Sequence, residues 1–227
     1  MGLLDYSNKE NTLTEVFRGI RTNIEYANID TDKKVIMVTS SKMGEGKSTI
    51  ITNLAISFAQ LEQKKILVVD CDLRRPTLHR IFKVSNSDGL TDILLTNKEM
   101  DECIKKVNDI DLITSGDTPK NPSEILASKK MENFLYKIKD NYDYIFIDTP
   151  PISVVTDAEV LSSLCDGAIL VIGYNEVDRS KVELSKSKLE HLKVPILGAV
   201  INKAPQKSEK YGYYDVDEKR KLFKLKK

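Results

Sequence analysis

Residues 35–49 read VIMVTSSKMGEGKST, and this stretch decides the fold of the chain. It begins with an apolar, β-branched run that predicts a buried strand (35–40). It then passes through a turn with Gly44 and Gly46 into a helical segment that ends near residue 62. Glycines let backbone N–H groups turn inward around phosphate oxygens, and the following helix adds its positive dipole end. A strand, a glycine-containing turn and a helix in this order predict a phosphate-binding loop, or P-loop.

Two side chains would give this loop its chemistry. Lys47 has the position from which a lysine reaches the β- and γ-phosphates, and Ser48 has the position of a Mg²⁺ ligand. The usual pattern starts with glycine five residues before its last glycine, and here that residue is Ser41. A glycine-rich turn without a ligand is the alternative. We predict ATP and Mg²⁺ as cofactors, and a nucleotide site made of Ser41, Lys42, Met43, Gly44, Glu45, Gly46, Lys47, Ser48 and Thr49.

Outward from the loop, apolar runs alternate with helical patterns. Further strands are predicted at 65–70, 110–116, 142–148, 167–173 and 195–202. Helical periodicity predicts helices at about 123–140 and 179–192. Strands that are apolar on both faces and alternate with helices form a mostly parallel sheet covered by helices on both sides. We therefore expect an α/β P-loop domain over residues 1–206.

Acidic residues end two of the predicted strands. Asp70 and Asp72 are two residues apart, so both point to one face of an extended chain, and Asp148 ends the run YIFID. A P-loop site needs a carboxylate near Mg²⁺, and a second carboxylate can accept a proton from an attacking hydroxyl. Helix caps and turns are the alternative use of aspartate. The candidate catalytic residues are Lys47, Asp70, Asp72 and Asp148.

An amphipathic helix is expected at about 12–27, because its apolar residues recur on one face. Glu15, Arg18 and Arg21 are spaced by three, so they form one stripe along this helix. Glu15 also completes a capping box with Thr12, and it can pair locally with Arg18. The stripe is therefore either a local ion pair or a contact with another subunit.

Composition excludes several classes of protein. Of the 227 residues, 41% are hydrophobic and 30% are charged, which is typical of a globular chain and not of a disordered one. No apolar run approaches the ~18 residues that span a bilayer, and the first ten residues do not read as a signal peptide. The three scattered cysteines predict no metal cluster. These features predict a cytoplasmic protein.

Several stretches of the chain resemble the bacterial tyrosine kinases of capsule and exopolysaccharide synthesis, the CpsD/CapB type. The resemblance covers roughly residues 12–214 and is most specific at the aspartate pair with its following arginine, Asp70, Asp72 and Arg74. This family has a P-loop fold of the MinD/ParA class. The stretches that carry the resemblance are GEGKS, ILVVDCDLRRP, YIFIDTPP, NPSEIL, DTPPISVVTDA and the closing tyrosine cluster.

The resemblance implies roles for the candidate residues. Asp70 would be the base toward a tyrosine hydroxyl, while Asp72 and Asp148 would join Ser48 in organising Mg²⁺ and its waters. Asn202, which ends the last predicted strand, would contact the adenine; a strand-end turn is the alternative. The residues implied in self-association into a ring of subunits are Glu15, Arg18 and Arg21. A separate membrane adaptor would activate the kinase and hold it at the inner face of the cell membrane.

The segment 207–227 differs from the rest of the chain. It carries eight Lys/Arg and four Asp/Glu, a net +4, which leaves −3 for residues 1–206. An acidic body predicts no nucleic-acid partner. We expect a flexible, basic tail whose tyrosines are phosphoacceptors, with packing onto the body as the alternative; its basic end could also favour anionic lipid. The three acceptor tyrosines are Tyr211, Tyr213 and Tyr214.

Two rival functions share the same nucleotide loop. A ParA/MinD-like partitioning ATPase is favoured by the basic tail and by Lys42, because related ATPases carry a signature lysine there that reaches across a dimer. An exposed loop lysine is the plain alternative for Lys42. The second rival is a non-catalytic ATP-binding regulator of polysaccharide export. The tyrosine cluster and the intact acids favour the autophosphorylating kinase, which could also act on other protein substrates.

Overall fold

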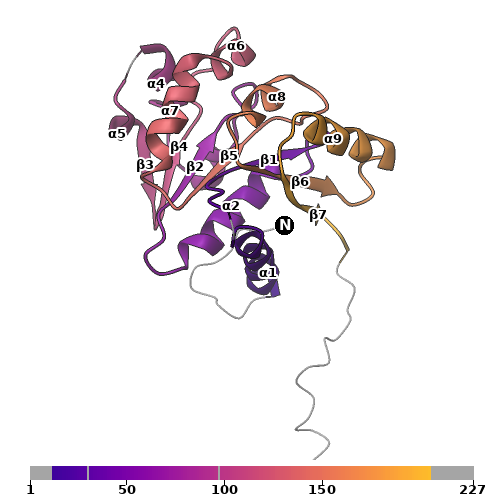
Figure 1. The fold of residues 1–227 in the computed structure, drawn as a ribbon. Helices are drawn as coiled ribbons and strands as arrows, with labels where there is room; N and C mark the ends of the chain where they lie inside the picture. Colours follow the sequence, from indigo (N-terminus) through magenta and orange to yellow (C-terminus); the bar gives the residue numbers. More distant parts are fainter. Residues whose placement is uncertain (1–11, 30, 97, 206–227) are drawn as a thin grey trace, which may run out of the picture.

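Seven strands form one sheet in the order β3-β4-β2-β5-β1-β6-β7 in the computed structural model, which describes residues 12–29, 31–96 and 98–205 (Figure 1). All neighbouring strands are parallel except β3 and β4. The predicted mostly parallel α/β sheet is therefore confirmed. The strands are β1 (Val35–Ser40), β2 (Ile66–Asp70), β3 (Ile104–Val107), β4 (Ile110–Ile113), β5 (Tyr144–Asp148), β6 (Gly167–Gly173) and β7 (Ile196–Asn202).

Helices cover both faces of the sheet, as the apolar strands require. Helices α1 and α2 pack on one face, where Phe58 of α2 lies 4.4 Å from Tyr144 between ring centroids. Helices α4, α7, α8 and α9 pack on the other face (Figure 1). The helices are α1 (Thr12–Tyr26), α2 (Lys47–Ala59), α3 (Leu78–Phe82), α4 (Leu90–Thr96), α5 (Met100–Cys103), α6 (Pro122–Leu126), α7 (Lys129–Lys139), α8 (Asp157–Ser162) and α9 (Arg179–His191).

Two of the differences from the sequence-based prediction concern a helix and an edge strand. The helix expected at 123–140 is two helices, because the chain breaks at Ser128, whose hydroxyl accepts a hydrogen bond from the Met131 N–H and starts α7. The antiparallel strand β3 was not predicted, since its sequence IKKV is half polar. A tight turn joins it to β4, with Asn108 in the left-handed region at φ 51°, which asparagine tolerates.

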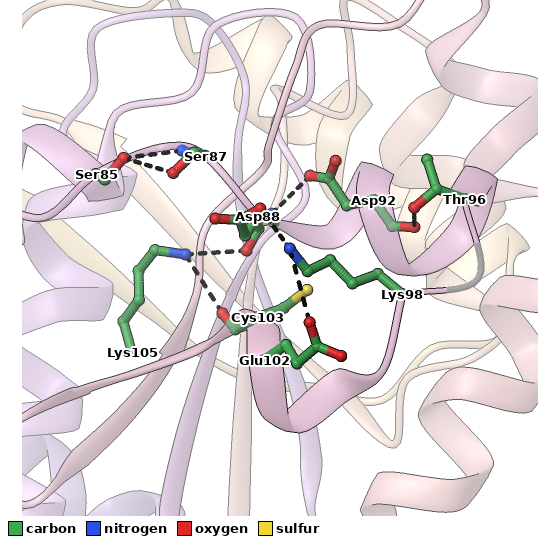
Figure 2. Close-up of polar contacts among 10 residues, drawn as sticks. Ser85, Ser87, Asp88, Asp92, Thr96, Lys98, Glu102, Cys103 and Lys105 are labelled. Atoms are coloured by element: carbon green, nitrogen blue, oxygen red, sulfur yellow. Dashed lines mark hydrogen bonds and ion pairs between the residues drawn. The ribbon is translucent and has the colours of Figure 1, made fainter.

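Asp88 anchors this edge of the sheet through two lysines. Lys98 Nζ lies 2.7 Å from the Asp88 carboxylate, and Lys105 Nζ donates to the Asp88 carbonyl over 3.0 Å (Figure 2). Lys105 also donates to the Cys103 carbonyl, so α5 and β3 are held to the loop before α4. These contacts stabilise the short edge strand at a distance in sequence from all the predicted nucleotide-site residues.

The carboxyl ends of β1, β2 and β5 meet at one edge of the sheet because these strands are neighbours. Asp70 and Asp148 are paired in register across β2 and β5. The loop after β1 leads directly into α2 at the same edge. The topology thus brings the phosphate loop and both strand-end acids together. In the described part of the chain, each helix is too short or too polar to cross a bilayer.

Candidate active site

The glycines of the loop are required by its backbone. Gly46, at the N-cap of α2, has φ 92°, and Gly44 has φ 84°, both in the region that favours glycine. A Cβ on Gly46 would lie 2.1 Å from Asn202 Nδ2, so no larger residue fits there. The Gly46 carbonyl accepts from the Ile50 N–H over 2.9 Å and starts the helix. The loop therefore ends in a helix N-terminus that is open to an anion.

Lys47 and Ser48 occupy the first turn of α2. The Lys47 side chain is only 7% exposed, and its charge acts on the carboxylates of Asp72 and Asp148. Ser48 Oγ donates to Asp148 Oδ2 over 2.6 Å and accepts from Thr77 Oγ1 over 2.7 Å. Thr77 was not among the predicted site residues, because nothing in the sequence near Pro76 marks it. The Ser48 hydroxyl thus links the end of the loop to β5 and to the start of α3.

Asp148 is held fully buried with one oxygen unused. Its Oδ2 accepts from Ser48, while Oδ1 has no hydrogen-bond partner among the described residues. Burial raises the pKa of Asp148 to about 6, although the positive charge of Lys47 and the Ser48 hydrogen bond act in the opposite direction. An unsatisfied buried acceptor is costly unless a ligand uses it. Oδ1 is thus available to a cation or a water bound to one.

Asp70 is also fully buried, but its oxygens are occupied. Oδ2 accepts from the Thr77 N–H at 3.2 Å and the Leu78 N–H at 3.1 Å, and Oδ1 accepts from the Asp72 N–H at 3.2 Å. A carboxylate has about four lone-pair sites, so one is left for a further donor. Burial, followed by the charge of Asp148, raises the pKa of Asp70 well above its usual range, despite these hydrogen bonds.

Asp72 faces the cleft beside the loop and is only partly buried. Its Oδ1 accepts from the Arg75 N–H over 3.1 Å, which fixes the turn after β2. Burial raises the pKa of Asp72, with the charge of Lys47 acting against the shift. Of the three predicted acids, Asp72 is the one whose side chain lines the open space, so it is accessible to a ligand there.

The donor set fits Mg²⁺ in the manner of a P-loop site. No group of three or more His, Cys, Asp or Glu in the described ranges could hold a metal by itself. Mg²⁺ is usually held by one or two protein oxygens, with phosphate oxygens and water completing its shell. The Ser48 hydroxyl and the unpartnered Asp148 Oδ1 supply such oxygens, and Asp72 lies near them.

The cleft outside these acids is cationic. It has a volume of about 490 Å³ and runs between the loop, the turn after β2, and the segment 150–155. Four basic side chains and one acidic side chain, that of Asp72, line it. This excess of positive charge suits a triphosphate. The basic residues are Lys47, Arg74, Arg75 and Arg80.

Glu45 and Lys42 brace the loop from behind. The Glu45 side chain is fully buried and accepts from the Lys42 N–H at 2.8 Å and the Gly173 N–H at 2.9 Å. Lys42 Nζ donates to the Glu176 carbonyl of the same chain. Met43 and Thr49 line the cleft itself. The loop is thus hydrogen-bonded to the end of β6, a link that no local sequence pattern reveals.

Asn202 lies against the loop at the end of β7. Its side-chain amide donates to the Glu45 carbonyl over 2.8 Å, and its oxygen accepts from the Lys203 N–H over 2.9 Å. Lys203 Nζ in turn donates to the Gly44 carbonyl at 2.7 Å and pairs with Glu176 at 2.8 Å. Asn202 therefore shapes the loop in this structure, and its adenine contact stays a prediction.

Ser41, which replaces the first glycine of the usual loop pattern, is hydrogen-bonded to helix α9. Its hydroxyl accepts from Ser185 Oγ of α9 over 2.9 Å, and Ser185 lies 2.7 Å from Ser153 Oγ. All three lie between the loop, α9 and the segment after β5. A serine at this position thus adds a buried link to α9 that glycine could not make.

Arg74 joins three of the stretches that carried the resemblance. Its Nε and Nη2 donate to the two oxygens of the fully buried Asp157, at 2.9 and 3.0 Å. Nη2 also donates to Ser123 Oγ over 3.1 Å, and Ser123 Oγ donates to Asp157 over 2.5 Å. Bidentate pairs of this kind fix the orientation of both side chains and also contribute stabilising energy. NPSEIL and DTPPISVVTDA thus help to position the turn that carries Asp72.

The stripe on α1 divides into an exposed and an anchored part. Arg18 pairs with Glu15 on the surface, with side-chain exposures of 46% and 59%. Arg21 instead donates through Nη1 to the Ser57 carbonyl of α2, and its Nε is buried with no hydrogen-bond partner among the described residues. The local Glu15–Arg18 pair is confirmed, and both side chains remain accessible to another molecule. The predicted acceptors Tyr211, Tyr213 and Tyr214 lie outside the described residues.

Comparison with known proteins assigns the chain to a family. A family model described as an AAA domain matches residues 33–176. The chain is 43% identical over 204 residues to the tyrosine-protein kinase YwqD of Bacillus subtilis (strain 168), covering 88% of this chain and 86% of YwqD. It is 36% identical over 203 residues to the tyrosine-protein kinase CpsD of Streptococcus agalactiae, covering 88% and 87%.

Solved structures agree with this relation. The kinase domain of the Escherichia coli tyrosine kinase Etk superposes with a TM-score of 0.85 at 32% identity, covering 92% of this chain and 82% of that one. The chimerical protein CapA2B2 gives 0.83 at 36% identity, covering 88% of each chain. MinD of Pyrococcus horikoshii, at 23% identity and a TM-score of 0.64, shares the fold, so the partitioning ATPases are the more distant relation. The chain belongs to the family of bacterial tyrosine-protein kinases.

Proposed function

We propose that this chain transfers the γ-phosphoryl group of ATP to tyrosines 211, 213 and 214 of its own kind, and through this regulates capsule or exopolysaccharide synthesis. The proposal is carried by one arrangement in a member of the tyrosine-kinase family. Lys47, Ser48 and Asp148 meet at the carboxyl ends of adjacent parallel strands, with Asp72 beside them in a cationic cleft. Phosphoryl transfer needs such positioning and charge neutralisation more than covalent chemistry.

The loop residues would hold the nucleotide. Backbone N–H groups of the loop and the N-terminus of α2 would face the phosphates, and Lys47 would neutralise charge on the β- and γ-phosphates. Ser48, Asp72 and Asp148 would hold Mg²⁺, which supplies charge stabilisation to the transferring phosphoryl group when bound. Asn202, packed on Gly46, would border the adenine.

Asp70 is our candidate for the base. The tyrosine oxygen forms a bond to the γ-phosphorus as the bond to the bridging oxygen of ADP breaks, and Asp70 accepts the hydroxyl proton. A raised pKa makes a carboxylate a better proton acceptor near neutral pH, and the pKa of Asp70 is raised by burial and by Asp148. Because three backbone N–H groups already occupy Asp70, the hydroxyl would use its remaining lone pair.

Mapping phosphotyrosine by mass spectrometry after incubation with Mg-ATP tests this function. We expect phosphate on the tail tyrosines, and more of it when the cytoplasmic part of the membrane adaptor is added. Deleting residues 207–227 should remove the acceptors. If no phosphotyrosine forms even with the adaptor fragment, while the deleted protein still hydrolyses ATP at the full rate, the chain is a partitioning-type ATPase instead. Nucleotide binding without turnover would identify a non-catalytic regulator.

We further propose that residues 1–206 form a kinase domain and that residues 207–227 form a tail. The tail of each subunit would be phosphorylated in the active site of a neighbouring subunit. A ring of subunits and a membrane adaptor, which would place the protein at the inner face of the membrane, are supported by family membership. The likeness to the CapA2B2 chimera agrees with a two-protein system. The accessible pair Glu15–Arg18 offers both charges to a neighbour.

Reversing the charge of Arg18 tests this assembly. Arg18→Glu places two carboxylates three residues apart on the exposed face of α1, and it removes any pairing of Arg18 with a neighbour's acid. We expect the mass measured by light scattering to fall from that of the oligomer to that of a single chain. Arg179→Glu, on the exposed part of α9, is the control and should keep the oligomer. An unchanged mass for Arg18→Glu would exclude this contact.

A further inference from the structure

Two arginines at the mouth of the cleft have no acidic partner within the described residues. Arg75 closes the turn that holds Asp72, and Arg80 lies five residues further along, on α3. Both line the cleft and both are exposed. Arg80 Nη2 donates to the Pro76 carbonyl, over 3.1 Å, and within the described ranges neither guanidinium takes part in an ion pair with a carboxylate.

The other two basic residues of the cleft are already committed. Lys47 is buried at 7% exposure beside Asp72 and Asp148, and it serves the phosphates. Arg74 is clasped by both oxygens of Asp157. Arg75 and Arg80 are therefore surplus positive charge on the outer part of the cleft, the side from which a protein substrate would have to enter.

The tail sequence complements this charge. Residues 211–218 read YGYYDVDE, so three acidic residues follow Tyr214 within four positions, and the next basic residue is Lys219. Arginine clusters are a recurring way to recognise acidic motifs, because the guanidinium fork pairs with carboxylates in two parallel hydrogen bonds. An acidic stretch beside the acceptor tyrosine would meet Arg75 and Arg80 as the hydroxyl reaches the phosphates.

We propose that Arg75 and Arg80 select the substrate by pairing with Asp215, Asp217 and Glu218 of a tail, so that the kinase prefers tyrosines followed by acidic residues. The proposal rests on the proposed kinase function and adds the chemical class of its acceptor. It also explains how a tail of net charge +4 can enter a cationic cleft: residues 211–218 carry three acidic side chains and no basic one, so this stretch enters, while Lys210 and the basic residues from Lys219 onward stay outside.

A transfer assay between two full-length variants tests it. The acceptor carries Lys47→Met, so that it receives phosphate without transferring any, and the enzyme carries phenylalanine in place of all three tail tyrosines. The acceptor is prepared with its native tail and with a neutral tail, Asp215→Asn, Asp217→Asn and Glu218→Gln. We expect KM for the neutral acceptor to rise about ten-fold, the size of effect that two partly exposed ion pairs supply.

Exchanging the charges of the two arginines and the tail acids shows whether the arginines pair with the tail or only maintain the structure of the enzyme. An enzyme with Arg75→Glu and Arg80→Glu should lose activity on the native tail and regain it on a tail with Asp215→Lys and Asp217→Lys. The control enzyme carries Arg179→Glu and Lys186→Glu on α9, an equal change of charge on an exposed helix. It should still prefer the native tail.

The outcomes distinguish the two levels of the proposal. Recovery on the exchanged tail supports pairing, because a damaged fold would not be rescued by its substrate. Equal KM values for the native and neutral tails would overturn the inference and leave the kinase function standing. The same holds if the KM of the charge-exchanged enzyme for ATP rises by the same factor with every acceptor. Absence of transfer from the unaltered enzyme to either tail would overturn both.

Discussion

Replacing Lys47 with methionine is expected to lower tail phosphorylation by roughly two to three orders of magnitude, the cost of removing one preorganised charge from a reaction that develops negative charge. Lys47 is buried, with only 7% of the residue exposed to water. A buried charge acts through a lower effective dielectric than an exposed one, so its loss is felt fully at the phosphates. Methionine keeps the length of the side chain without the charge.

The measurement is the initial rate of phosphate transfer to tail tyrosines, together with the thermal melting temperature. Lys129→Met, on α7, is the matched control, because Lys129 is 76% exposed and pairs with Glu132 on the surface. It should transfer phosphate at the rate of the unaltered protein. If Lys47→Met kept more than a tenth of that rate while melting normally, the loop would not be the catalytic phosphate site.

Local sequence was sufficient to predict the described strands other than β3, the loop and the strand-end acids. Buried parallel strands are recognisable because they are apolar on both faces, and the carboxyl ends of such strands meet at one edge. Gly44 and Gly46 are needed for their positive φ values, which is a local requirement that a pattern records. The side-by-side position of Asp70 and Asp148 follows from the register of β2 and β5, which the topology fixes.

Contacts between distant segments could not be predicted in this way. The links from Glu45 to Gly173 and from Asn202 to the loop span more than 120 residues. Each depends on the placement of β6 beside β1 or of β7 beside β6, and no periodicity encodes that placement. The same holds for Arg74, whose partners Asp157 and Ser123 come from two later segments. Their sequences were notable only through the family resemblance.

The charge on Asp148 is expected to lower the stability of the fold and to be required for phosphoryl transfer. Its carboxylate is fully buried next to Asp70 in the sheet, and Oδ1 has no partner in the part of the chain that the structure describes. We therefore expect Asp148→Asn to abolish transfer, with a loss of roughly a hundred-fold or more. We expect the same change to raise the stability of the nucleotide-free protein by about 1–3 kcal/mol, since it removes a buried charge.

The stability gain expected for Asp148→Asn depends on pH. Burial raises the folded pKa of Asp148 from 3.8 to about 6, so ionisation costs stability above the unfolded pKa, and this cost is complete once pH exceeds the folded pKa. The asparagine variant should thus melt roughly 2–12 °C higher at pH 7.5. Its advantage should shrink as pH falls through 6 and vanish below about pH 3, where Asp148 is protonated in both states.

Asp143→Asn, at the opposite end of the same strand, is the matched control and should behave in the reverse way. Asp143 accepts from Lys64 Nζ and from the Lys65 N–H, each at 2.9 Å. Burial opposes the shift, but these partners leave its pKa lowered, so the charged form stabilises the fold and asparagine should lower the melting temperature. If Asp148→Asn also melted lower at pH 7.5, Asp148 would be held by favourable contacts of its own. Its free oxygen would then be no sign of a cation site.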